Sequence, residues 1–184
     1  MRNIIYAINL TIDGCCDHTK GAGGEDILEF FADLIQGADL LVSGRVTYKL
    51  MVPYWPDIAK NKSGDTDEIK FARVFDAAEK LVFSHSLDKV EDKRSRLARN
   101  PLPDEMLKLK QEEGKYILLG GVDLPSQLIA RGLIDEFIIV VQPVIAGEGR
   151  RLFEGVSLQE KLSLKLVESK TLRSGSVALH YVKQ

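Results

Sequence analysis

Cysteine is nearly absent from this chain of 184 residues, which has only two, the adjacent Cys15 and Cys16. Adjacent cysteines cannot form the Cys-x-x-Cys pattern of a zinc site or a dithiol redox centre, so we expect no metal site. Two free thiols are typical of a protein in the reducing cytoplasm. Long apolar runs are absent as well: no stretch approaches the ~18 residues of a membrane span. Asn3 and Asn9 interrupt the apolar N-terminal segment, so we expect no signal peptide either.

The chain also has little excess charge of either sign. It contains 25 Lys and Arg against 27 Asp and Glu, a net charge of −2. Such a chain exerts no general attraction on nucleic acids or anionic membranes, and we expect neither as a partner. A chain of this length buries about 70% of its unfolded surface as one domain. We therefore expect a single domain over residues 1–184.

Apolar runs and helical spacings alternate along the chain. We expect strands over residues 2–12, 40–43, 81–84, 116–119 and 136–144. We expect helices over residues 25–36, 65–78, 103–112 and 123–131. Asp65 and Glu68 stand in capping-box positions at the start of the second helix, and Asp123 is the expected cap of the last. Residues 53–66 are predicted to form a loop, and the charges of residues 88–100 to form a solvated segment.

The last thirty residues change character, because apolar and polar side chains alternate in residues 162–166 and 177–182. This alternation around a turn at 173–175 predicts an antiparallel hairpin at a sheet edge. The whole order predicts an α/β fold with a mostly parallel central sheet, helices on both faces and a C-terminal antiparallel hairpin.

Two of the expected strands end in glycine, and these junctions are the strongest functional signal. The first runs into Gly44 and is followed by Arg45 and Thr47; the second runs into Gly120 and Gly121. A strand that turns into a helix at glycine exposes backbone N–H groups and the positive end of a helix dipole, which suits a phosphate. Since ligands bind at the carboxyl ends of parallel strands, two such junctions predict a dinucleotide site.

These residues also carry a family resemblance. Residues 44–48, Gly-Arg-Val-Thr-Tyr, resemble the Gly-Arg-x-Thr-aromatic signature of the dihydrofolate reductase fold, and residues 117–121 resemble its pyrophosphate-binding strand and glycines. Residues 132–153 resemble more closely the C-terminal reductase domain of the riboflavin-biosynthesis deaminase–reductases and its stand-alone bacterial relatives. Residues 12–14 and 82–87 fit the same pattern, so the resemblance extends from about residue 3 to residue 182.

The resemblance implies an NADPH site whose residues come from four segments. Asn9 offers its backbone to the nicotinamide amide, and the serine-rich segment after the third strand takes the adenosine 2′-phosphate. The implied cofactor-binding residues are Asn9, Gly44, Arg45, Thr47, Ser84, His85, Ser86, Gly120, Gly121, Val122, Asp123 and Leu124. The implied reaction is reduction of a small heterocyclic substrate, similar to that of 5-amino-6-(5-phosphoribosylamino)uracil reductase, in a cytoplasmic homodimer.

The substrate half of the site departs from the family pattern. Leu119 stands where these reductases have a substrate-contacting glutamate, and residues 49–55 replace their arginine-containing segment. Asp26, in the first turn of the expected helix 25–36, is the candidate catalytic acid, although an acid there also stabilises the helix dipole. Two other functions stay open. One is a dihydrofolate reductase, against which the absent Met-Pro-Trp loop argues; the other is a non-catalytic NADPH-binding protein.

Overall fold

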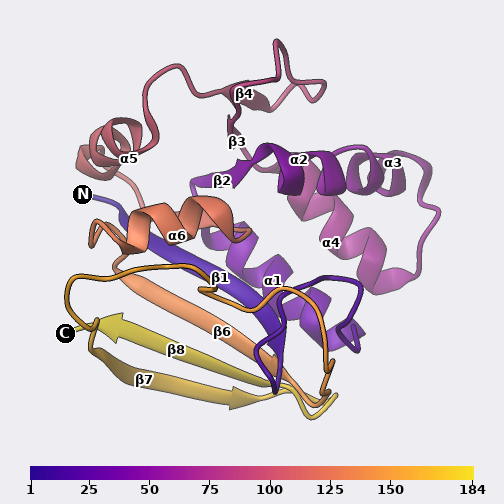
Figure 1. Ribbon diagram of the computed structural model, residues 1–184. Helices are drawn as coiled ribbons and strands as arrows, with labels where there is room; N and C mark the ends of the chain where they lie inside the picture. Colours follow the sequence, from indigo (N-terminus) through magenta and orange to yellow (C-terminus); the bar gives the residue numbers. More distant parts are fainter.

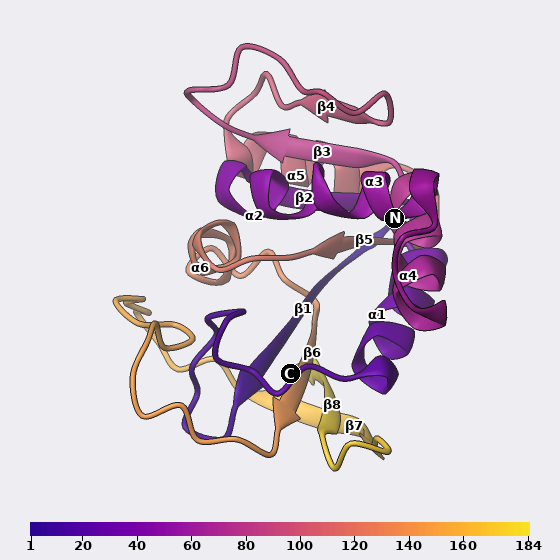
Figure 2. The same cartoon turned by 90° about the vertical axis from the view of Figure 1, so that its right-hand side faces the viewer.

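A single eight-stranded sheet organises the computed structural model, which describes residues 1–184. The strand order is β4-β3-β2-β5-β1-β6-β8-β7 (Figure 1 and Figure 2). Neighbouring strands from β4 to β6 are parallel, whereas β8 pairs antiparallel with β6 and β7 with β8. The predicted α/β fold with a C-terminal hairpin is therefore confirmed.

Most elements lie where they are predicted, and residues 45–51, 54–61 and 95–97 form further elements for which the sequence analysis predicts none. The strands are β1 (Asn3–Thr11), β2 (Leu40–Gly44), β3 (Lys80–Phe83), β4 (Ser95–Leu97), β5 (Tyr116–Leu119), β6 (Glu136–Gln142), β7 (Leu164–Thr171) and β8 (Val177–Lys183). The helices are α1 (Glu25–Gly37), α2 (Arg45–Met51), α3 (Tyr54–Asn61), α4 (Thr66–Ala77), α5 (Leu102–Gln111) and α6 (Asp123–Ile129). No helix is both long enough and apolar enough to cross a membrane.

Side-chain alternation along the strands divides the core between the two faces of the sheet. In β1, Ile4 and Tyr6 face the cluster that α5 and α6 cover, while Ile5 and Ala7 face the cluster under α1, α2 and α4. Figure 2 shows α1 and α4 on one side of the sheet and α6 on the other. Burial on both faces explains why the central strands are continuously apolar.

Local signals at one helix start are confirmed. The carboxylate of Asp65 accepts hydrogen bonds from the N–H groups of Asp67 and Glu68, and the Glu68 carboxylate accepts one from the Asp65 N–H at 3.0 Å. This reciprocal pair satisfies N–H groups that a helix end leaves free. The predicted start of α4 at this position is therefore correct.

Two predictions for the surface segments are wrong. Residues 53–66 contain α3 rather than only loop. Pro56 does not interrupt this helix, because it lies in the first helical turn, where no N–H is required. The Trp55 ring packs on Phe71 of α4, with centroids 4.5 Å apart. The charged segment 88–100 is not simply solvated: its residues Ser95–Leu97 form β4, which pairs with β3.

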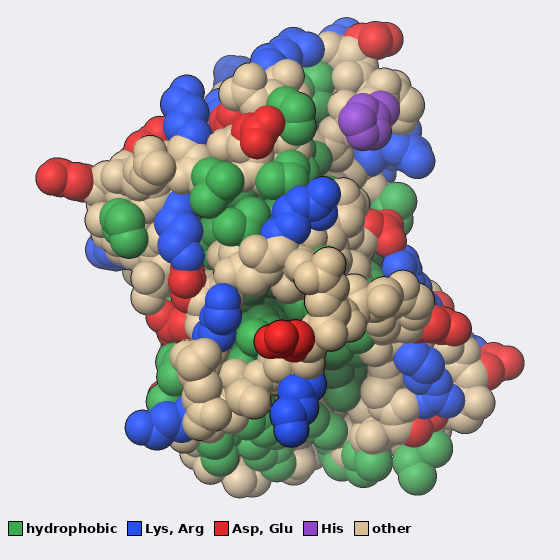
Figure 3. Space-filling model, turned by 60° about the vertical axis from the view of Figure 1, so that its left-hand side comes forward, with side chains coloured by type: hydrophobic (Ala, Val, Ile, Leu, Met, Phe, Trp, Pro, Cys, Tyr) green, Lys and Arg blue, Asp and Glu red, His purple; other side chains and the backbone are tan.

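The apolar strand β6 lies between β1 and β8, so contacts within the chain already account for its apolar composition. It is therefore no evidence for a subunit interface. The edge strand β7 exposes Leu166 and Val167 instead, each about half accessible at 48%. On the face shown in Figure 3, acidic and basic side chains are mixed, and hydrophobic side chains gather near the lower edge, at the level of β7 and β8.

The ion pair between Lys80 and Asp92 gives a test of the packing around β3. Its N–O distance is 2.9 Å, and its side chains are only 4% and 9% exposed. The substitution Lys80→Met leaves the Asp92 carboxylate buried without its partner, so we expect the free energy of unfolding to fall by about 3 kcal/mol in urea titrations. The control Arg94→Met removes an exposed pair with Glu79 and should cost less than about 1 kcal/mol. Equal losses would contradict the packing described here.

Candidate functional site

A pocket of about 280 Å³ opens at the carboxyl ends of β2, β3 and β5. The ends of the three strands lie near one another because β2 pairs in parallel with both neighbours: Gly44 lies opposite Phe83, and Leu119, the last residue of β5, opposite Val42. Polar residues that follow separate strands are thereby brought to one edge of the sheet. This is the edge at which open α/β sheets bind ligands.

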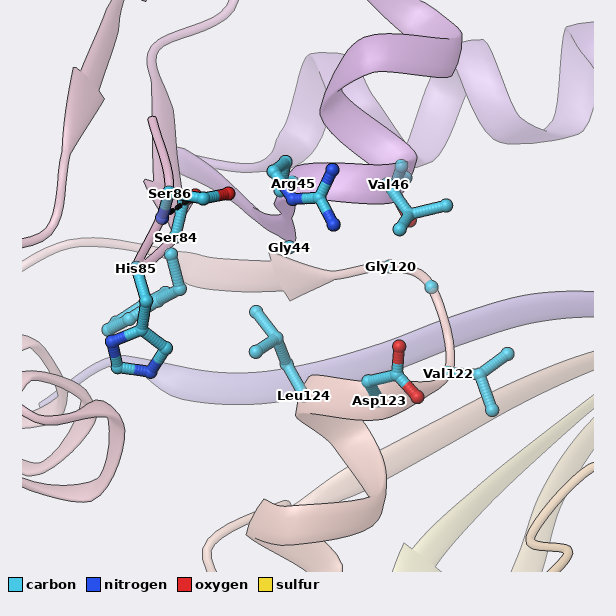
Figure 4. A pocket seen from close by; sticks show the side chains of 13 residues that line it. Gly44, Arg45, Val46, Ser84, His85, Ser86, Gly120, Val122, Asp123 and Leu124 are labelled. Atoms are coloured by element: carbon cyan, nitrogen blue, oxygen red, sulfur yellow. Dashed lines mark hydrogen bonds between the residues drawn. The ribbon is translucent and has the colours of Figure 1, made fainter. Parts of the chain in front are cut away.

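The residues predicted to bind the cofactor line this pocket, with the exception of Asn9. Figure 4 shows Arg45 and Val46 entering from α2, Asp123 and Leu124 from α6, and Ser84, His85 and Ser86 from the segment after β3. The lining residues are Gly44, Arg45, Val46, Thr47, Phe83, Ser84, His85, Ser86, Gly120, Gly121, Val122, Asp123 and Leu124. Val46 and Phe83 are the two that sequence reasoning missed, since neither carries a polar group.

The two glycine junctions pack against each other. Gly121 has a φ of +83°, and a Cβ there would lie 2.6 Å from the Thr47 hydroxyl oxygen of α2. In return, Leu124 of α6 lies over Gly44, where a Cβ would be 3.6 Å from its Cγ. The left-handed φ and the close approach together require glycine at position 121. Thr47 therefore has a packing role at the junction as well as a polar group in the pocket.

Free backbone donors make the second junction suitable for an anion. The N–H groups of Gly121 and Val122 have no partner among the hydrogen bonds of the protein. The first N–H groups of α6, beginning at Asp123, lack intrahelical acceptors as at any helix start. A Cβ built at Gly120 meets nothing within 4 Å, so the backbone there is uncovered. A phosphate group fits this row of donors.

Cationic and hydroxyl groups complete the polar lining. The guanidinium of Arg45 makes no ion pair or hydrogen bond with any other residue and is exposed beside the junction. The Ser84 hydroxyl oxygen accepts hydrogen bonds from the N–H groups of Ser86 and Leu87, at 3.1 and 3.0 Å, which folds this turn tightly. The hydroxyls of Ser84 and Ser86 and the His85 ring thus come from one ordered turn.

Tyr6, which sequence reasoning missed, supports the junction from below. Its hydroxyl donates a hydrogen bond of 2.9 Å to the Gly121 carbonyl, and its ring is fully buried beside Phe137 and Phe153. Burial raises the pKa of Tyr6, which keeps the hydroxyl protonated as a donor. A tyrosine in a buried strand looks like an ordinary core residue, so no sequence signal distinguishes this role.

Asp123 does not cap α6 as predicted. The cap residue is Val122, with no side-chain hydrogen bond, and the Asp123 carboxylate instead pairs with Arg150 at 2.7 Å. The hydrogen bond that Arg150 donates to this carboxylate raises the pKa of Arg150. Arg150 lies 27 residues away in the sequence. The acid in the first turn is thus used in a tertiary contact rather than a local one.

Asn9 lies outside the pocket, on a part of β1 that is open on one side. The pairing with β5 covers only Asn3 to Tyr6, because β5 ends at Leu119, whereas the pairing with β6 continues to Thr11. The edge of β1 from Ala7 to Thr11 therefore has no strand on the β5 side. A flat group could approach the backbone there, and the role of Asn9 stays a prediction.

Asp26 is buried and held by the hairpin turn, away from the pocket lining. Its Oδ2 accepts a hydrogen bond of 2.6 Å from the Ser174 N–H between β7 and β8. Burial acts to raise the pKa of Asp26, but hydrogen bonds from Ser174 and the charge of Arg173 outweigh it, and the net pKa is lowered. The carboxyl is therefore ionised at neutral pH, a state that disfavours proton donation. Its catalytic role stays a prediction.

The substrate half of the site contains few polar groups at the positions where the family has them. Leu119 is fully buried in the core, so it does not face the pocket. Trp55, in the segment that replaces the family's arginines, packs within the cluster under α4. Leu119 thus does not replace the family's glutamate in the pocket, and the Trp55 ring packs on Phe71.

The contact of Tyr6 with Gly121 is testable by the substitution Tyr6→Phe. It leaves the Gly121 carbonyl without its donor while keeping the ring, so we expect the free energy of unfolding to fall by about 1 kcal/mol. Tyr181→Phe is the matched control, since the Tyr181 ring is half-buried and its hydroxyl has no partner in the protein. Urea unfolding measures both variants, and a loss no greater for Tyr6→Phe than for the control would argue against the support described.

The hydrogen bond between the Asp26 carboxylate and the Ser174 N–H predicts that the free energy of unfolding depends on pH. A carboxyl whose pKa is lowered by folding stabilises the protein above its unfolded pKa and loses this effect as the pH falls through its folded pKa. We expect Asp26→Asn to lower the free energy of unfolding by about 1–2 kcal/mol at pH 7, with the deficit shrinking below about pH 4. Asp33→Asn, on the exposed side of α1, is the control. If the stability lost in Asp26→Asn did not change with pH, the ionised Asp26 carboxylate would not be the group that stabilises the contact with Ser174.

Sequence comparison relates the chain to two bacterial proteins of nearly equal length. It is 32% identical to the uncharacterized protein YyaP of Bacillus subtilis (strain 168), over 98% of this chain and 94% of YyaP. It is 30% identical to YwjB of the same organism, over 99% of this chain and 98% of YwjB. The profile of the RibD C-terminal domain matches residues 2–178.

Solved structures show the same fold. A pyrimidine reductase-like protein of Corynebacterium diphtheriae superposes with a TM-score of 0.66 at 14% identity, covering 100% of this chain and 92% of that one. A Thermotoga maritima protein described as a deaminase and 5-amino-6-(5-phosphoribosylamino)uracil reductase gives a TM-score of 0.67 at 14% identity. This chain spans 57% of that longer protein. The fold is thus that of the dihydrofolate-reductase-like reductases of the riboflavin pathway, and the chain belongs to the RibD C-terminal domain family.

Proposed function

We propose that this chain is an NADPH-dependent reductase of a small heterocyclic substrate, related to the pyrimidine reductases of riboflavin biosynthesis. The observation that carries the proposal is the pocket at the ends of β2, β3 and β5, where free N–H groups, an unpaired Arg45 and a serine-rich turn face one space. These donors suit a ligand with several phosphates.

In this proposal each part of the pocket binds a different part of the cofactor. The N–H groups of Gly121 to Asp123 and the Arg45 guanidinium bind the diphosphate. Ser84, His85 and Ser86 bind the 2′-phosphate that distinguishes NADPH from NADH. The open edge of β1 at Asn9 orients the nicotinamide. The bound cofactor supplies the hydride, and the chain supplies orientation.

Asp26 is the proposed substrate-facing acid. Because the carboxylate is ionised, it acts as an acceptor for N–H groups of a heterocycle rather than as a proton donor. Substrate would then compete with Ser174 for Oδ2. A homodimer and a cytoplasmic location are also part of the proposal; the exposed apolar side chains of the edge strand β7 and the two free cysteines are consistent with them.

The substitution Arg45→Ala tests the cofactor site. We expect NADPH affinity to fall by roughly 10- to 100-fold, as for one charge-assisted contact of ~1.5–3 kcal/mol. Arg131→Ala is the control, because Arg131 follows the other end of α6 and its side chain bonds only to the Gln127 carbonyl. Nicotinamide fluorescence is the signal to follow, since Trp55 lies under α4 rather than in the pocket. Equal NADPH affinity in Arg45→Ala and Arg131→Ala would contradict a role of Arg45 in binding the cofactor.

The function is tested by titrating the protein with NADPH and NADH, followed by NADPH oxidation with a panel of heterocycles. Micromolar NADPH binding with at least ~10-fold preference over NADH, equivalent to ~1.4 kcal/mol, supports the cofactor assignment. Substrate-dependent oxidation then supports a reductase, and turnover of dihydrofolate would identify a folate reductase instead. Binding without turnover would favour a non-catalytic nucleotide-binding protein, and no binding of either nucleotide would refute the proposal.

A further inference from the structure

The pocket contains an unfavourable charge for the ligand that its donors suit. Asp123 lines the pocket with its side chain 64% exposed, and its own N–H group belongs to the row of free donors. Its carboxylate therefore lies beside the position at which a phosphate would bind. The carboxylate and a phosphate at neighbouring positions repel each other. This repulsion weakens phosphate binding unless a cation neutralises the carboxylate.

Arg150 is the cation that meets this carboxylate. Its Nη2 lies 2.7 Å from the Asp123 Oδ1, and Asp123 has no other ion-pair partner. Arg150 itself is not among the residues that line the pocket. It therefore pairs with Asp123 without being part of the pocket lining itself.

The backbone that carries Arg150 is held firmly in place. The Arg150 carbonyl accepts a hydrogen bond of 2.9 Å from the Cys16 N–H. The next residue, Arg151, pairs with Asp13 at 2.8 Å, and the same carboxylate accepts the N–H groups of Ala146 and Gly147. The two neighbouring arginines thus have different partners. Arg151 fixes the segment to the loop that follows β1, and Arg150 reaches the start of α6.

We infer that Arg150 is an affinity-determining residue for the phosphates of the cofactor, acting by neutralising Asp123 at the edge of the pocket. It is a positioning residue, because it acts through Asp123 rather than by touching the ligand. The inference rests on the proposed function, since it assigns Arg150 to the same NADPH site. It also explains how an acidic residue can occupy an anion-binding junction.

The test is a double-mutant cycle measured by NADPH binding, with the wild-type affinity determined first. We expect Arg150→Met to weaken NADPH binding by about 10-fold at low salt, and less at high salt because screening reduces the repulsion. Asp123→Asn should bind NADPH at least as tightly as the wild type. The double variant D123N/R150M should return to within about 3-fold of Asp123→Asn, because the charge that Arg150 neutralises is gone.

Arg150→Lys provides a second variant, which keeps the charge and should retain more affinity than Arg150→Met. Both side chains of the pair are at least about half exposed, at 49% and 64%, so these variants are expected to fold, and circular dichroism checks this. Wild-type affinity in Arg150→Met would overturn the inference. A double variant as weak as Arg150→Met would also overturn it, by showing that Arg150 binds the ligand directly. A wild-type protein that does not bind NADPH would instead refute the proposed function, and the inference with it.

Discussion

The parallel pairing of β2 with β3 and β5 is the constraint on which the site depends. Gly44 lies opposite Phe83, so β2 and β3 end level, and β5 ends slightly earlier, with Leu119 opposite Val42. Their following segments then share one edge of the sheet, and the glycines allow α2 and α6 to pack closely at that edge. A shift of register would separate the guanidinium, the hydroxyls and the free N–H groups that the pocket combines.

The central strands are buried on both faces of the sheet, and this packing holds the edge that forms the pocket in place. β1 sends Tyr6 to one face, where its hydroxyl holds the Gly121 carbonyl, and Ile5 and Ala7 to the other, where α1 and α4 cover them. The same strand ends at Thr11, just before Asp13, whose carboxylate fixes the segment carrying Arg150. One buried strand thus positions both the glycine junction and the charged contact beside it, and links the core to the pocket.

The success of sequence reasoning depended on how local each signal was. The glycine junctions and the capping box at Asp65 were predicted correctly because their residues lie within a few positions of one another. Asp123 was misassigned as a cap, since its partner Arg150 is 27 residues away. Tyr6 was missed for the same reason, because its partner Gly121 lies 115 residues away. The helix α3 was missed because two prolines near its start resemble a loop, although its packing on Phe71 stabilises it.

The sequence by itself determined the class of the fold, the order of its main strands and helices and the two strands that end in glycine. These follow from apolar periodicity and from glycine at strand ends, which act over a few residues. Only the tertiary structure decided which groups meet. It tied Asp26 to Ser174, paired Asp123 with Arg150 and placed Leu119 in the core. Such contacts join residues far apart in the chain, and their geometry is set by the packing of the sheet and its helices rather than by local sequence.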